Sequence, residues 1–126
     1  MISRSNYSIV RKAVNRSSRQ ERVCKIIPLA NKKYLSVIAE IEYLKKLNHP
    51  NIVQIIEYFI DSSLIYIILE DIPGGKLLGQ LVGNTASLEI IQKIFMQLLL
   101  AVKYLHSKMI AHRAITVNNL VLYWVK

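Results

Sequence analysis

The segment Pro73-Gly74-Gly75 divides the chain into two parts whose apolar residues follow different patterns. Before this break lie four short apolar runs separated by polar residues, at 9–13, 23–28, 52–59 and 64–69. These runs predict strands, the last two of them paired as an antiparallel hairpin. After the break, Ser87 is a good N-cap residue. The apolar residues behind it recur at helical spacing, and they are Ile90, Ile91, Ile94, Phe95, Leu98, Leu99, Val102 and Leu105.

A second helical pattern separates the first two strands from the last two. Its apolar residues form a single stripe, made of Tyr34, Val37, Ile38, Ile41, Leu44 and Leu47. We expect this helix to end before Pro50, because the residue that precedes a proline avoids helical backbone angles. A small sheet with one helix, followed by a mostly helical part, predicts an α+β fold. A chain of 126 residues suits one domain.

Basic residues are concentrated at the start of the chain. The formal net charge is +9, and residues 1–33 hold nine basic side chains against Glu21 alone. Such a surface attracts phosphates and acidic proteins, although it can equally be a solvated sheet surface. Tyr7 is the only aromatic residue before Tyr34, which argues against the base stacking used by nucleic-acid binding proteins. Any anion binding is therefore expected to depend on phosphate contacts and on salt.

The single cysteine, Cys24, cannot form an intramolecular disulfide. This favours a reducing compartment, so a cytoplasmic or nuclear location is expected. The most apolar stretch, 90–105, is interrupted by polar residues that include Gln92, Lys93 and Lys103, so no membrane span is predicted. The spacing of the His, Cys and acidic residues matches no zinc site.

Five short motifs occur in a fixed order along the chain. They are Val23-Cys24-Lys25, Glu40 nine residues before His49, the string Leu47-Asn48-His49-Pro50-Asn51-Ile52-Val53, the string Tyr104-Leu105-His106-Ser107-Lys108, and His112-Arg113-Ala114 with Asn119 behind it. Together they resemble the eukaryotic protein kinase family, and the serine/threonine type most closely. The resemblance implies a small lobe of antiparallel sheet plus one helix at 1–70, a hinge at 71–75, and the first helices and catalytic loop of a truncated large lobe at 76–126.

The resemblance also implies a nucleotide site. Lys25 and Glu40 correspond to the ion pair that orients the phosphates, although such a pair can equally be a structural salt bridge between helix and sheet. Leu69 corresponds to the gatekeeper, and Glu70, Asp71 and Ile72 to the hinge segment whose backbone meets the adenine edge. The other positions carried over as nucleotide contacts are Val10, Val23 and Val121.

Several positions depart from the family pattern. Ala114 stands where the family has its proton-accepting aspartate, and a methyl group cannot accept a proton. Ser3, Ser5 and Ser8 stand where the family has the three glycines of its phosphate loop, and their Cβ atoms resist close backbone approach to phosphates. Asn119 corresponds to a metal-binding asparagine, but the chain ends before an Asp-Phe-Gly motif, so the metal site is expected to be incomplete. We therefore expect weak ATP binding and an impaired magnesium site.

Three functions remain open on these observations. The first is a catalytically inactive, pseudokinase-like module that binds a protein partner or itself through the apolar helix after Ser87 and the tail 120–125, for which no partner strand is visible. The second is a serine/threonine kinase with weak activity, or one whose missing half is supplied elsewhere. The third is a basic anion-binding protein.

Overall fold

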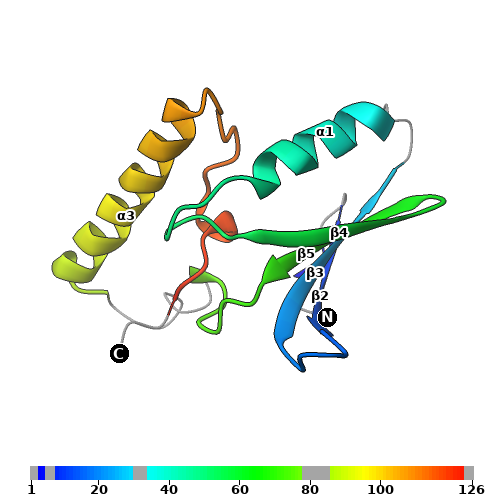
Figure 1. Cartoon of the computed structure of the whole chain (residues 1–126). Helices are drawn as coiled ribbons and strands as arrows, with labels where there is room; N and C mark the ends of the chain where they lie inside the picture. Colours follow the sequence, from blue (N-terminus) through cyan, green and yellow to red (C-terminus); the bar gives the residue numbers. More distant parts are fainter. Residues whose placement is uncertain (1–2, 5–7, 30–33, 78–85, 124–126) are drawn as a thin grey trace. The chain divides into compact units, whose positions relative to one another are not determined.

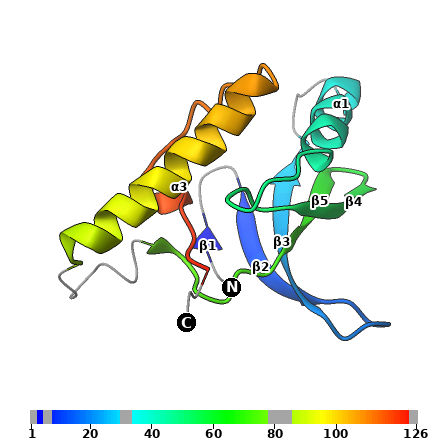
Figure 2. The same ribbon diagram turned by 60° about the vertical axis from the view of Figure 1, so that its left-hand side comes forward.

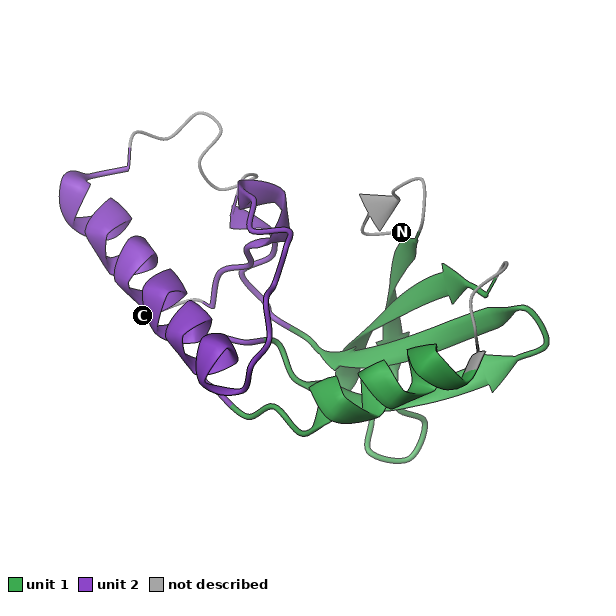
Figure 3. Ribbon diagram, turned by 90° about the horizontal axis from the view of Figure 1, so that it is seen from above, with its two compact units in different colours: residues 1–48, 53–71 green, residues 49–52, 72–126 purple. Residues whose placement is uncertain are grey.

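The computed structural model describes residues 3–4, 8–29, 34–77 and 86–123. They belong to two compact units, which are coloured separately in Figure 3. Unit 1 comprises Met1–Asn48 and Val53–Asp71, and unit 2 comprises His49–Ile52 and Ile72–Lys126.

Unit 1 is built on an antiparallel sheet of five strands (Figure 1). The strands are β1 Ser3–Arg4, β2 Ile9–Val14, β3 Glu21–Pro28, β4 Ile55–Asp61 and β5 Leu64–Glu70. They lie in the order β1-β2-β3-β5-β4, which Figure 2 shows across the sheet. Strands are thus confirmed at all four apolar runs of the first part of the sequence, although the third begins at Ile55 and not at residue 52. The second pair forms the expected hairpin.

The turn between β2 and β3 is held by Asn15. Its Oδ1 accepts hydrogen bonds from the backbone N–H groups of Ser17 and Ser18, at 3.0 and 2.9 Å. Arg19 closes the turn with a φ of 61°, a left-handed conformation that is uncommon outside glycine. Asparagine favours turns because its side chain can bond to nearby backbone groups, so this polar run joins the two strands as a hairpin.

Helix α1, Tyr34–Lys45, packs its apolar stripe against one face of the sheet. The core consists of Ile41 from the helix with Ile65 and Ile67 from β5, and these side chains are 4%, 1% and 8% exposed. Residues 65 and 67 share a face because side chains alternate along a strand. The helix ends at Lys45, and the N–H groups of residues 46 and 47 donate to carbonyls three residues back, a tighter turn that is common at helix ends.

Unit 2 contains the predicted long helix, α3 Leu88–Ser107. Ser87 is its N-cap, and its Oγ accepts a hydrogen bond from the N–H of Ile90 at 3.3 Å. Ala101 and Leu105 are buried. Many of its other apolar side chains are exposed by 46–70%, namely Leu88, Ile90, Ile91, Phe95, Met96, Leu99 and Leu100. Within the residues that the structure describes, we find no helix with the length and apolar character needed to cross a bilayer.

The described part of the tail belongs to none of the strands of the structure, but its backbone pairs with the segment after Pro73. Val121 forms an antiparallel bridge with Lys76. The N–H of Leu77 donates to the carbonyl of Leu120 at 2.9 Å, and the N–H of Leu122 donates to the carbonyl of Gly75 at 2.8 Å. This partner segment lies far away in the sequence. Residues 124–126 fall outside the described part.

Gly74 is the position where this pairing tolerates no side chain. A Cβ built on Gly74 would lie 1.9 Å from the carbonyl oxygen of Leu122. Because backbone atoms cannot move aside as a flexible side chain can, we expect Gly74→Ala to open the bridge. We expect it to cost about 1–3 kcal/mol of unfolding free energy, as overpacking of a tight contact does. Chemical denaturation of the purified variant measures this.

The neighbouring glycine supplies the control for Gly74→Ala. Gly75 has a φ of 67°, and no heavy atom lies within 4 Å of a Cβ placed there. Asparagine adopts this left-handed region more readily than most residues, so Gly75→Asn should change stability much less. Equal losses for both variants would contradict the steric explanation.

Candidate active site

The register of the sheet brings together four of the predicted nucleotide residues. Val10 of β2 lies opposite Lys25 of β3, and Val23 of β3 lies opposite Leu69 of β5. Directly opposite residues share a face, as do residues two apart on a strand. The four half-buried side chains therefore lie on one face. There the three aliphatic side chains could pack against the ring of a nucleotide base, and the Lys25 ammonium group could contact a phosphate.

Lys25 and Glu40 are not joined in this structure. Within the described residues the ion pairs are Lys12–Glu21, Lys12–Asp71 and Lys93–Glu89. Glu40 is exposed on α1, because its neighbour Ile41 is the residue that points into the core, and adjacent residues lie about 100° apart around a helix. The phosphate-orienting role of Lys25 and Glu40 therefore stays a prediction.

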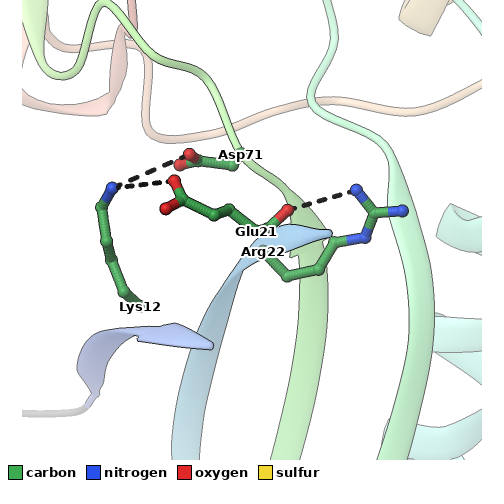
Figure 4. A network of polar contacts seen from close by, with 4 residues as sticks. All are labelled: Lys12, Glu21, Arg22 and Asp71. Carbon is green, nitrogen blue, oxygen red and sulfur yellow. Dashed lines mark hydrogen bonds and ion pairs between the residues drawn. The ribbon is translucent and has the colours of Figure 1, made fainter. Parts of the chain in front are cut away.

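Lys12 adds a polar cluster to the same face of the sheet. It lies opposite Val23 in the register, and its Nζ is 3.2 Å from Glu21 Oε2 and 4.0 Å from Asp71 Oδ2 (Figure 4). The Asp71 side chain is only 19% exposed. Lys12 is a site residue that the motifs did not point to, although its position two residues after Val10 places it on that face by strand periodicity.

The predicted hinge residues fall at the boundary between the two units. The backbone N–H of Gln54 donates to Glu70 Oε1 at 2.8 Å, and the N–H of Glu70 donates to the carbonyl of Gln54 at 3.1 Å. Glu70 thereby ties the end of β5 to the segment before β4. Ile72 belongs to unit 2, where its carbonyl accepts a hydrogen bond from the N–H of Gly75 at 3.1 Å. Val121 also belongs to unit 2, in the bridge with Lys76.

The loop around Ala114 is held by two side chains. The backbone N–H of Ala114 donates to His112 Nδ1 at 3.2 Å, and Asn119 Nδ2 donates to the carbonyl of Ala114 at 2.8 Å. Arg113 has a φ of 62°. The short 3₁₀ helix η1, Val117–Asn119, places the asparagine. The loop thus leaves the Ala114 methyl group exposed. The amide nitrogen of Asn119 helps to hold the backbone of the loop.

Two further features concern reactive groups. Within the described residues no cluster of three or more His, Cys, Asp or Glu side chains could hold a metal ion. Burial raises the pKa of the Cys24 thiol, and nearby Arg11 lowers it in part. A buried thiol with a raised pKa is a poor nucleophile. Of the predicted phosphate loop, Ser5 lies outside the described residues.

Comparison with known proteins identifies the family. The family model of the protein kinase domain matches residues 2–124. The chain belongs to the protein kinase family. This kinase-family chain is similar to the crystal structure of Rad53 residues 1–466 in complex with AMP-PNP, with a TM-score of 0.91 and 30% sequence identity. The match covers 98% of this chain and 33% of the Rad53 chain. The predicted fold class, a kinase-like small lobe with the start of a large lobe, is confirmed.

Curated relatives are protein kinases by name. A probable serine/threonine-protein kinase, fhkE of Dictyostelium discoideum, is 36% identical over 131 residues, which is 97% of this chain and 18% of the relative. Calcium-dependent protein kinase 5 of Plasmodium berghei is 33% identical over 124 residues, which is 94% of this chain and 22% of the relative. The chain spans about a fifth of the length of these relatives. Their likeness confirms the serine/threonine branch.

Proposed function

We propose that this chain is a pseudokinase-like module that binds a nucleotide weakly, has lost most of its phosphoryl transfer, and acts by binding proteins. The loop around Ala114 carries this proposal. Its backbone is held at both ends by His112 and Asn119, yet it presents a methyl group at the position of the proton acceptor. Phosphoryl transfer to a hydroxyl uses an aspartate there.

Nucleotide binding is supported by the sheet face that carries Val10, Val23, Lys25 and Leu69. The similar Rad53 structure is a complex with AMP-PNP, a nucleotide, and we extend nucleotide binding to this chain as part of the proposal. Affinity is expected to be low, because serines replace the glycines of the phosphate loop and Lys25 lacks its acidic partner. Magnesium is expected to add little, since its carboxylate ligands are not identified in this chain.

Thermal-shift titration with ATP, with and without magnesium, tests this proposal. A ligand that binds only the folded state raises the melting temperature with concentration, so we expect a small shift that is nearly the same without magnesium. Lys25→Met should abolish this shift, because it removes the only cation predicted to contact the phosphates. Lys103→Met, on the exposed surface of α3, is the matched control and should keep it. No shift in the unsubstituted chain would argue against nucleotide binding.

A serine/threonine kinase with weak or complemented activity is the second candidate. The names of the relatives favour it, and the family membership supports it as well as it supports an inactive domain. The two candidates differ in one measurable quantity, the turnover of a protein substrate. Turnover that Lys25→Met abolishes would favour the enzyme.

The chain has two further candidate partners, a polyanion and a protein. A basic anion-binding role would rest on exposed side chains of the β2–β3 hairpin, such as Arg11, Arg16 and Arg19, and it would be excluded by a lack of binding to polyanions at low salt. The exposed apolar side chains of α3 support a protein partner or self-association.

A cytoplasmic location is proposed from the free Cys24 alone.

A further inference from the structure

The sheet of unit 1 has a second face, opposite to the one that packs against α1. The register places one residue from each of four strands in a row across this face, Ile9, Ile26, Tyr66 and Phe59. None of them belongs to the core cluster formed by the described residues, and Phe59 is 54% exposed. An apolar row therefore crosses the sheet on a face that α1 does not cover.

In the next two rows on this face, a positive side chain lies on one side of the sheet and a negative one on the other. Arg11 lies at the β2 end of the second row and Glu57 at the β4 end, with Cys24 and Ile68 between them. In the third row, Arg22 of β3 lies opposite Glu70 of β5. The positive side chains thus lie on β2 and β3, and the negative ones on β5 and β4.

We propose that this face is the interface of a homodimer, with the two sheets packed face to face. The two copies are related by a twofold axis that runs parallel to the strands and midway between β3 and β5. This rotation brings β2 of one copy over β4 of the other. Each row of residues in one copy then lies against the same row of the other copy. Arg11 then meets Glu57 of the partner subunit, and the equivalent contact forms a second time, as twofold symmetry requires.

The same rotation matches the other rows. It places Ile26 against Tyr66 of the partner subunit, Ile9 against Phe59 of the partner subunit, and Arg22 against Glu70 of the partner subunit. Nearly aligned strands in packed sheets are a common arrangement, with about 10 Å between the sheets. Apolar side chains therefore meet apolar ones, and Arg11 meets a carboxylate.

Charge complementarity favours a second copy over a different partner. An acidic partner would be repelled by Glu57 and a basic one by Arg11, whereas the rotated copy satisfies both signs at once. Glu70 and Arg22 have hydrogen-bond partners within the chain and carry less of this argument. The face holds fewer residues than the roughly 20–30 per side of a stable interface. We therefore infer a weak dimer that forms in the micromolar range and loosens at high salt.

A charge swap can detect this contact because it cannot form within one chain. Arg11 and Glu57 lie on strands separated by two others in the sheet, and neighbouring strands are about 4.8 Å apart, so roughly 14 Å separates them. Arg11→Glu places glutamates opposite each other twice in a dimer, and Glu57→Arg does the same with arginines. We expect each variant alone to dimerise at least about tenfold more weakly than the unsubstituted chain.

An equimolar mixture of the two variants is the decisive measurement. If the contacts are those proposed, the introduced glutamate faces the introduced arginine in a heterodimer, and the unchanged Arg11 of one chain faces the unchanged Glu57 of the other. The double variant R11E/E57R should recover because both of its contacts again join opposite charges. Sedimentation velocity over a micromolar concentration series is expected to show dimer in the mixture and in the double variant. Arg16→Glu, with the same charge change in the β2–β3 turn, should leave the dimer unchanged.

Three results would overturn the proposal. They are a monomer throughout the concentration series, a dimer that is insensitive to both single variants, and a mixture no more dimeric than its components. An insensitive dimer would place association elsewhere, such as on α3. Melting curves of the variants separate loss of folding from loss of the interface. If a charge variant is unstable, Phe59→Gln tests the interface in its place, because it alters only an exposed side chain and is expected to weaken the dimer.

Discussion

Ile65→Ala is expected to lower the unfolding free energy by about 2–5 kcal/mol, the usual cost of truncating a buried isoleucine to alanine. Ile65 is 1% exposed and packs with Ile41 of α1 and Ile67 of β5 in the core cluster. Its truncation leaves a cavity between helix and sheet. Urea denaturation followed by circular dichroism measures the loss.

Ile56→Ala is the matched control, because it makes the same chemical change at the β4 bulge, where the side chain is 36% exposed. It is expected to cost much less. Ile65→Val should lie between the two, at about 0.5–1.5 kcal/mol. If Ile65→Ala and Ile56→Ala were equally destabilising, the assignment of Ile65 to the centre of the core would be wrong.

Ala114→Asp is expected to raise the rate of phosphoryl transfer to a protein substrate by about 10²–10⁴ over the unsubstituted chain, since a positioned proton acceptor contributes this much. The loop should accept the change, because both of its supporting hydrogen bonds use backbone atoms of residue 114 and its side chain is exposed. Transfer of labelled phosphate from ATP in the presence of magnesium measures the rate.

Ala114→Asn is the matched control for the aspartate, because it has the same shape and cannot accept a proton. It is expected to stay at the level of the unsubstituted chain. Lys25→Met combined with Ala114→Asp should remove the gain. Rapid turnover by the unsubstituted chain would refute the proposed loss of activity and favour the serine/threonine kinase alternative.

Local patterns predicted most of the secondary structure. The spacing of Ile38, Ile41 and Leu44 predicted α1, and Ser87 with the apolar stripe behind it predicted α3. These elements depend on side chains within a few residues of one another, so their signals are present in the linear chain. The motifs around Lys25, His49 and Ala114 also lie on single segments, and their order was sufficient to predict the family.

Contacts between distant segments were predicted less well. The tail was expected to lack a partner strand, yet Leu122 pairs with Gly75. Glu40 is exposed on α1 and makes none of the ion pairs given for the described residues, so its pairing with Lys25 stays a prediction. Neither outcome has a local signal, because each depends on where a helix or strand docks. Lys12 was not predicted from the sequence, and only the fold brought Asp71 to it.

The sequence by itself determined the family, the order of the strands and helices from β2 to α3, and the replacement of the proton acceptor by Ala114, because each is a property of residue identity at a given spacing. The tertiary structure decided which side chains share a face of the sheet, why Gly74 tolerates no side chain, and how the loop around Ala114 is held. Those features come from strand register and from close packing between segments distant in the chain. The polarised charge pattern of the second sheet face belongs to this group, since Arg11 and Glu57 are related only through the order of the strands.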